Sequence, residues 1–82
     1  MITVISNPNC DRCRIAKKRL ELAKVPFRAE MLSSFSTEDQ MFYIALAREH
    51  GQQKFPIIIN EDNEILDLEG VLTDVRQNRQ NS

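Results

Sequence analysis

The sequence predicts an α/β fold in which a mixed four-stranded sheet is covered by three helices, in the order β-α-β-α-β-β-α. Short apolar runs at 1–5 and 55–59 alternate with two amphipathic segments, and turn-forming residues at 60–63 join the last two strands. Strands joined through a helix pair in parallel, whereas strands joined by a tight turn pair antiparallel, so the sheet is mixed. At 82 residues the chain holds one core, and we expect residues 1–82 to form a single domain.

The first half of the chain predicts a strand, a helix and a second strand. Residues 1–5 favour a strand, which the turn-forming residues 6–9 end. An amphipathic helix is expected over residues 14–24, because side chains recur at helical spacing along one stripe, which comprises Cys13, Ala16, Leu20 and Ala23. Val25-Pro26 stops this helix, and residues 27–32 form the second predicted strand.

The middle of the chain predicts a second helix with its own start and stop signals. Two overlapping capping patterns precede it, pairing Ser36 with Asp39 and Thr37 with Gln40. The helix is expected over residues 37–50, and Gly51 is a natural C-terminal stop. Its buried face is predicted to comprise Met41, Ile44 and Ala45.

The last third predicts a hairpin of two strands and a final helix. Residues 55–59 form a buried strand, and residues 64–68 form the strand that returns after the turn. The final helix is expected over residues 70–80, with Thr73 or Asp74 near its first turn.

Composition and charge narrow the function classes. The formal net charge is −1, so we expect no nucleic-acid partner. No apolar run approaches the roughly 20 residues of a membrane span, and the first residues show no secretory signal pattern, so no membrane partner is expected. A reducing cytoplasm is the expected location, because a close pair of cysteines can turn over there.

Both cysteines lie in Cys10-Asp11-Arg12-Cys13, at the predicted start of the first helix. Two thiols at this spacing form a reversible dithiol/disulfide couple. The unpaired N–H groups and the partial positive charge of a helix N-terminus favour a thiolate, so we expect them to lower the pKa of the Cys10 thiol. Cys13 lies on the apolar stripe and is expected to stay protonated. The pattern therefore predicts thiol–disulfide exchange, in which Cys10 attacks a substrate disulfide and Cys13 resolves the mixed disulfide.

Two other interpretations of these cysteines are inert buried thiols and ligands of a metal ion. A structural zinc site usually takes four Cys or His ligands, and this chain offers Cys10, Cys13 and His50. Neither a metal ion nor a bound organic cofactor is therefore expected. His50 stands just before Gly51, so we interpret it as a C-terminal helix residue rather than as a catalytic base.

The whole pattern resembles glutaredoxins. The matching features are the strand and turn before the two cysteines, the basic helix after them, Val25-Pro26-Phe27 at the second strand, and Phe55-Pro56-Ile57 late in the chain. The resemblance implies the thioredoxin-like fold and a glutathione-dependent disulfide oxidoreductase, with glutathione as co-substrate. It also implies that a cis peptide bond precedes Pro56 beside the cysteines, and that the Phe55 backbone pairs with the cysteine segment of the substrate.

Three departures from the glutaredoxin pattern concern the glutathione site. Asp11-Arg12 replaces the Pro-Tyr pair common between the cysteines, and Asn7 replaces a basic residue that meets a glutathione carboxylate. The Gly-Gly-x-x-Asp stretch that binds the γ-glutamyl end is reduced to residues 70–74, which hold one glycine. The residues that the resemblance assigns to substrate or glutathione binding are Phe55, Pro56, Gly70 and Asp74. Asp74 either meets the glutathione amine or serves only as a carboxylate at the helix N-terminus. Lys54 and Arg12 are expected to supply the charge that Asn7 lacks. We expect glutathione-dependent turnover that saturates poorly.

Other families share parts of this pattern. Residues 70–74 are closer to the glutaredoxin-like hydrogen donors of ribonucleotide reductase, which take electrons from thioredoxin reductase. Residues 7–20 also resemble arsenate-reductase-like proteins, which are longer. A third alternative is a thioredoxin-like adaptor, or a carrier of an iron–sulfur cluster bridged between two chains by Cys10 and glutathione. The expected partners are glutathione and disulfide-containing proteins, with ribonucleotide reductase a plausible target, and the chain itself is expected to be a monomer.

Overall fold

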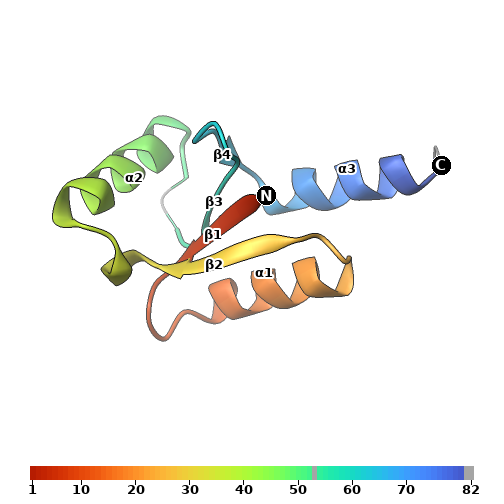
Figure 1. Ribbon diagram of the computed structural model, residues 1–82, viewed down its shortest axis with the longest axis horizontal. Coiled ribbons are helices and arrows are strands. Elements are labelled where there is room, and N and C mark those ends of the chain that lie inside the picture. Colours follow the sequence, from red (N-terminus) through yellow and green to blue (C-terminus); the bar gives the residue numbers. More distant parts are fainter. Residues whose placement is uncertain (53, 81–82) are drawn as a thin grey trace.

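The computed structural model of the chain describes residues 1–52 and 54–80 (Figure 1). Its elements are, in order, β1 (Ile2–Ser6), α1 (Asp11–Leu22), β2 (Phe27–Met31), the short 3₁₀ helix η1 (Leu32–Ser34), α2 (Thr37–Glu49), β3 (Ile57–Ile59), β4 (Ile65–Leu66) and α3 (Leu68–Gln80). This order confirms the predicted β-α-β-α-β-β-α pattern and adds one 3₁₀ turn before α2. Within the described residues, no helix combines the length and the apolar character that crossing a bilayer requires.

The four strands form one mixed sheet in the order β2-β1-β3-β4. β1 pairs with β2 in parallel, from Ile2 opposite Phe27 onward, because α1 carries the chain back between them. β3 pairs antiparallel with both β1 and β4, which confirms the predicted hairpin after β3. Figure 1 shows α1 and α2 on opposite sides of the sheet, with α3 extending away from it.

Each face of the sheet buries its own apolar cluster, because neighbouring residues of a strand point to opposite faces. On the α2 side the buried residues are Ile5, Ala47, Ile57 and Ile59. On the α1 side they are Val4, Leu20 and Ile58, and Leu68, Val71 and Leu72 of α3 pack against them. The alternation therefore places α1 and the first turns of α3 over one face of the sheet and α2 over the other.

The predicted buried face of α2 is wrong. Met41 is 67% exposed and Ala45 is exposed, whereas Ala47 is buried and Tyr43 packs against the cluster of Ile5. Both possible rows of apolar residues contain Ile44, so helical spacing alone does not choose between them. The row through Tyr43 faces the sheet, where the partly buried ring of Tyr43 packs against the cluster of Ile5 and contacts Phe35, with 5.1 Å between ring centroids.

The boundaries near the end of the chain also differ from the prediction. The strand β3 begins at Ile57 rather than at residue 55, and β4 comprises only Ile65–Leu66. The helix α3 begins at Leu68, two residues earlier than expected, because Leu68 and Val71 lie one helical turn apart and both pack on the α1 side of the sheet. Its first backbone hydrogen bond runs from the Val71 N–H to the Asp67 carbonyl, at 3.0 Å.

The predicted helix signals are largely confirmed. The Ser36 hydroxyl accepts a hydrogen bond from the Asp39 N–H at 3.2 Å and caps α2. Gly51 ends that helix in the left-handed conformation, with φ of 73°. Lys24 ends α1 in the same conformation, with φ of 59°, and the following N–H of Val25 donates to the Leu20 carbonyl at 3.0 Å. Both helices therefore end in the same left-handed motif, one with glycine and one with lysine.

Candidate redox site

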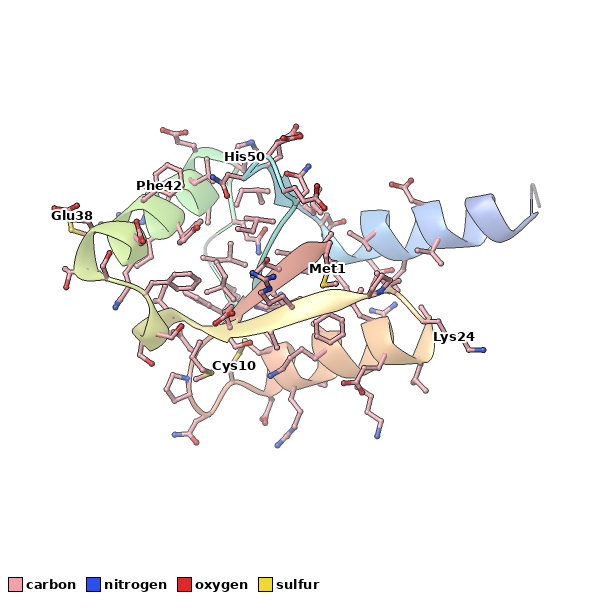
Figure 2. All side chains as sticks on the ribbon, in the orientation of Figure 1. Met1, Cys10, Lys24, Glu38, Phe42 and His50 are labelled. Atoms are coloured by element: carbon pink, nitrogen blue, oxygen red, sulfur yellow. A yellow bond between two sulfur atoms is a disulfide. The ribbon has the colours of Figure 1, made fainter. Side chains whose placement is uncertain are left out.

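The two cysteines form a disulfide at the N-terminus of α1, with 5.3 Å between their Cα atoms. Asn9 has a φ of 56°, a left-handed conformation that asparagine tolerates, and it turns the chain from β1 toward the helix. Cys10 is the extended N-cap residue, and its carbonyl accepts the first helical hydrogen bond from Arg14 at 3.2 Å. Figure 2 shows Cys10 at the end of α1 opposite to Lys24.

The two sulfur atoms lie in different environments. Cys13 is 2% exposed and lies on the buried face of α1 with Ala16 and Leu20. Cys10 is partly exposed, because it precedes the helix rather than packing beneath it. The Cys13 N–H also donates a hydrogen bond to Cys10 Sγ at 3.2 Å. An incoming disulfide can therefore reach Cys10, while the protein covers Cys13.

Charged residues lie between the cysteines and directly after them. Asp11 is exposed and its carboxylate accepts a hydrogen bond from the Arg14 guanidinium at 2.6 Å. Arg12 is exposed, and none of the described residues forms an ion pair with it. The negative charge of Asp11 is thus partly offset by Arg14, and Arg12, two residues after Cys10, adds a positive charge to the first turn of α1. This charge adds to the effect of the helix N-terminus on a Cys10 thiolate.

The Phe55–Pro56 peptide bond is cis, which confirms the bond geometry that the resemblance implied. The Gln52 side-chain amide donates to the Pro56 carbonyl at 2.6 Å and so ties this loop to the end of α2. Pro56 is buried, and it lines a cavity of about 300 Å³ together with Arg12 of the first turn of α1. The structure therefore brings the cis-proline loop and the N-terminal turn of α1 to one cavity.

Lys54 and Phe55 lie on the other side of the cis-proline loop. They line a cavity of about 520 Å³ with Arg48 of α2 and contribute a cation and an aromatic wall. Lys54 is exposed and Phe55 is partly buried, packed against the cluster of Ile5. This cavity holds two cations, Arg48 and Lys54, and no carboxylate among its lining residues.

Gly70 and Asp74 lie in the last helix, as the sequence predicted. Both lie inside α3, Gly70 in the first turn and Asp74 in the second, because the helix begins at Leu68. Asp74 is exposed and is absent from the residues that line the cavities beside the cysteines. The acidic residue of the first turn is Glu69, which lines the same cavity as Pro56 and pairs with Arg19 of α1 at 2.5 Å.

His50 lies at the C-terminal end of α2, as the sequence predicted, and its Nδ1 lies 3.1 Å from the Leu46 carbonyl. Figure 2 shows His50 and Cys10 on opposite sides of the sheet. Among the residues that the structure describes, no group of three or more His, Cys, Asp or Glu side chains is arranged to hold a metal ion.

Sequence reasoning missed three residues around the cysteines. Gln52 holds the cis-proline loop, and Glu69 stands where the first turn of α3 meets the cavity. Neither position carries a sequence signal, because both depend on how loops meet across the sheet. Ser6 is buried beneath the N-terminus of α1, and here a signal exists: it continues the inward-facing alternation of Ile2 and Val4 with a hydroxyl side chain.

No protein-family model and no curated protein matches the sequence. Several solved structures match the fold. The holo form of glutaredoxin C1 from Populus tremula x tremuloides is 20% identical with a TM-score of 0.64, and the match covers 94% of this chain and 68% of that one. A buckwheat glutaredoxin–glutathione complex is 20% identical with a TM-score of 0.63, covering 94% and 69%. A thioredoxin-like protein is 17% identical with a TM-score of 0.62, covering 89% and 96%. At these identities the likeness shows the fold, which is thioredoxin-like.

Proposed function

We propose that this chain is a glutaredoxin-like thiol–disulfide oxidoreductase. The Cys10 thiolate attacks a substrate disulfide, one substrate sulfur leaves as a thiol after taking up a proton, and a mixed disulfide with Cys10 forms. The Cys13 sulfur then attacks Cys10 Sγ, which releases the second substrate thiol and forms the Cys10–Cys13 disulfide. Two thiols of a reductant return the pair to the dithiol state. The protein is oxidised as its substrate is reduced.

The observation that carries this proposal is the asymmetry of the disulfide at the start of α1. Cys10 is partly exposed and accepts a hydrogen bond from the helix backbone, whereas Cys13 is buried behind it. An accessible attacking sulfur next to a shielded resolving sulfur is the arrangement that the two exchange steps require. A purely structural disulfide needs neither the helix N-terminus nor this difference in exposure.

The groove beside Pro56 supports a docking path for the substrate. A substrate segment that brings its sulfur to Cys10 runs past the cis-proline loop, where the Phe55 backbone is proposed to pair with it as an added strand. The groove itself has an apolar floor, including Ala16, Ile58 and Leu66, and Arg12 at its rim. We propose that this path accepts protein disulfides and glutathione mixed disulfides alike.

Glutathione is proposed as a reductant that binds weakly. The buckwheat glutaredoxin was solved as a glutathione complex, and Arg12 and Lys54 offer cations for carboxylates near the proposed docking path. Asn7 lacks a charge, and the helical placement of Gly70 and Asp74 leaves no glycine loop around a γ-glutamyl group. A well-placed charge-assisted hydrogen bond contributes about 1.5–3 kcal/mol, so losing one weakens binding by roughly ten- to a hundredfold.

A reductant comparison tests the proposal. One disulfide substrate is offered with glutathione and glutathione reductase, or with thioredoxin reductase, at several glutathione concentrations. We expect turnover with glutathione that saturates poorly, and a smaller effect of Asp74→Ala than of Lys54→Ala. Tight saturation that neither variant changes would remove the weak-binding claim, and the absence of any disulfide reduction with either reductant would remove the function.

A second function has support from α3. Residues 70–74 hold one glycine and resemble the corresponding segment of the hydrogen donors that thioredoxin reductase serves. Good turnover with thioredoxin reductase and none with glutathione would assign it to that role, with ribonucleotide reductase as a protein substrate. An absorbance spectrum of the fresh protein tests the iron–sulfur carrier, because a bound cluster is coloured.

A further inference from the structure

Ser6 is a buried polar residue that the exchange steps above do not use. It is the last residue of β1 and is 2% exposed, and its Oγ has no hydrogen-bond partner among the described residues. Burial of a hydroxyl without a hydrogen-bond partner lowers the stability of the fold. A hydroxyl kept at such a position is explained most simply by a partner that exists in another state of the protein.

The position of Ser6 shows which group that partner is. Val4, two residues earlier on the same face of β1, packs against Leu20 of α1. The helix runs back over the strand, so Ser6 lies under its N-terminal turns, and Ser6 lines one cavity of about 440 Å³ with Cys10 and Cys13. In the structure both sulfurs are joined in the disulfide. Reduction frees them, and the buried Cys13 sulfur is then the one that faces the sheet.

We propose that the Ser6 hydroxyl hydrogen-bonds to the Cys13 sulfur once the disulfide is reduced or mixed with substrate, and so positions Cys13 for the resolving step. Ser6 is a positioning residue, because it acts on the reaction through Cys13. The inference rests on the proposed function, because it assigns Ser6 to the second of the two exchange steps.

The chemistry needs such a group because Cys13 is buried. Burial disfavours the charged form of a thiol, and Cys13 must become a thiolate to attack Cys10 Sγ. The Ser6 O–H donates to that thiolate and is not consumed. The Cys13 proton passes to the leaving substrate sulfur or to water, a bond forms between Cys13 and Cys10, and the bond between Cys10 and the substrate breaks.

Other groups around this cavity act on Cys13 in a different way. The charged residues that line it are Asp11, Arg14 and Lys17, all on α1, while β2 contributes Met31 and the loop after β1 contributes uncharged residues. Asp11 and Arg14 form an exposed pair, and Lys17 is partly exposed. Solvent screens these charges, whereas Ser6 is buried beside Cys13. Removal of the Ser6 hydroxyl therefore changes the ionisation of Cys13 without changing these charged residues.

Two variants separate the hydrogen bond from packing. Ser6→Ala removes the hydroxyl with little change of volume, and Ser6→Thr restores a hydroxyl as the matched control. In a Cys10→Ser background, thiolate absorbance followed against pH reports where Cys13 ionises. With the full dithiol, rapid mixing with a glutathione mixed disulfide reports the rate at which the Cys10 adduct resolves. In a Cys13→Ser background, the same mixing reports the first attack alone.

We expect Ser6→Ala to move Cys13 ionisation to higher pH and to slow resolution by roughly tenfold or more, which corresponds to one hydrogen bond to a charged group. The first attack should keep its rate, and Ser6→Thr should recover most of the resolution rate. Unchanged ionisation and unchanged resolution in Ser6→Ala would overturn the inference, as would an equal slowing of both steps. If the wild-type protein reduces no disulfide, the proposed function is wrong. If the wild-type protein is active and Ser6→Ala behaves like it, only the role of Ser6 is wrong.

Discussion

The difference in reactivity between the two thiols can be predicted from the geometry of the helix start. In reduced Cys13→Ser only Cys10 remains, and in reduced Cys10→Ser only Cys13 remains. The Cys13→Ser change keeps the backbone N–H of residue 13, which donates to Cys10 Sγ at 3.2 Å in the structure. The single-thiol variants therefore compare an accessible, hydrogen-bonded sulfur with one that is 2% exposed.

The size of the effect follows from that one hydrogen bond. A hydrogen bond to a charged group contributes about 1.5–3 kcal/mol, which raises the thiolate fraction at a given mildly acidic pH by roughly ten- to a hundredfold over a free cysteine. The helix N-terminus and the cation of Arg12 act in the same direction, and Arg14 partly offsets the opposing charge of Asp11. Burial acts in the opposite direction on Cys13.

Alkylation at mildly acidic pH, followed by intact mass, measures both thiols. Cys10 in Cys13→Ser should react at least about ten times faster than an unstructured cysteine peptide, after allowance for the lower intrinsic nucleophilicity of a more acidic thiol. Cys13 in Cys10→Ser should react more slowly than the peptide. The reasoning is refuted if the variant that retains only Cys13 is the faster one.

Three further predictions concern stability, measured by urea unfolding. Lys24→Gly should raise the free energy of unfolding by about 0.5–1 kcal/mol, because glycine adopts the left-handed φ of 59° without strain. Gly51→Ala should lower it by about 1 kcal/mol, since nothing lies within 4 Å of the added Cβ to compensate for the strain. Changes of the same sign in both variants would contradict the left-handed motif. Met41→Ala should change the free energy of unfolding by less than about 0.5 kcal/mol, whereas Tyr43→Ala should lower it by at least about 2 kcal/mol. A larger loss in Met41→Ala than in Tyr43→Ala would support the buried face predicted from the sequence. Arg19→Gln and Glu69→Gln should each destabilise only slightly and less at high salt, because the pair is exposed. The hydrogen bond to Glu69 raises the pKa of Arg19. The stability that the ion pair contributes is therefore present below the ordinary pKa of arginine and is lost only as the pH rises through the raised pKa. A change in the destabilisation by Arg19→Gln between neutral and mildly alkaline pH would contradict this pH dependence.

Element order and the redox pair could be predicted from the sequence because both are local. Short apolar runs predict β1 and β3, and the spacing of Cys13, Ala16 and Leu20 predicts the buried face of α1. The capping hydroxyl of Ser36 needs only residues three positions away. Each of these features depends on neighbours along the chain, which the sequence displays directly.

The buried face of α2 and the start of α3 could not be predicted in this way. Two apolar rows of α2 share Ile44, and the choice between them depends on Phe35 and Tyr43 meeting across a loop. The start of α3 depends on Leu68 packing against Val4 and Leu20, which are far away in the sequence. Local propensity favoured Gly70 as a boundary, and tertiary packing overrode it.

The same long-range packing decides where Gly70 and Asp74 lie. The sequence predicted that the last helix begins at Gly70, with Asp74 near its first turn, whereas α3 begins at Leu68 and places Asp74 in its second turn. The cis-proline loop was expected from family resemblance alone, since a short range of sequence does not specify a cis bond. The single-domain, monomeric and cytoplasmic expectations stay predictions that await solution and cellular measurements.

Trapping of the mixed disulfide tests the central claim most directly. Reduced Cys13→Ser and reduced Cys10→Ser are each mixed with glutathione disulfide, and intact mass is recorded without added reductant. The account predicts a covalent glutathione adduct on Cys13→Ser, none on Cys10→Ser over the same time, and a wild type that returns to its internal disulfide without a lasting adduct. An adduct confined to Cys10→Ser, or an active wild type that never passes through an adduct on Cys10, would contradict it.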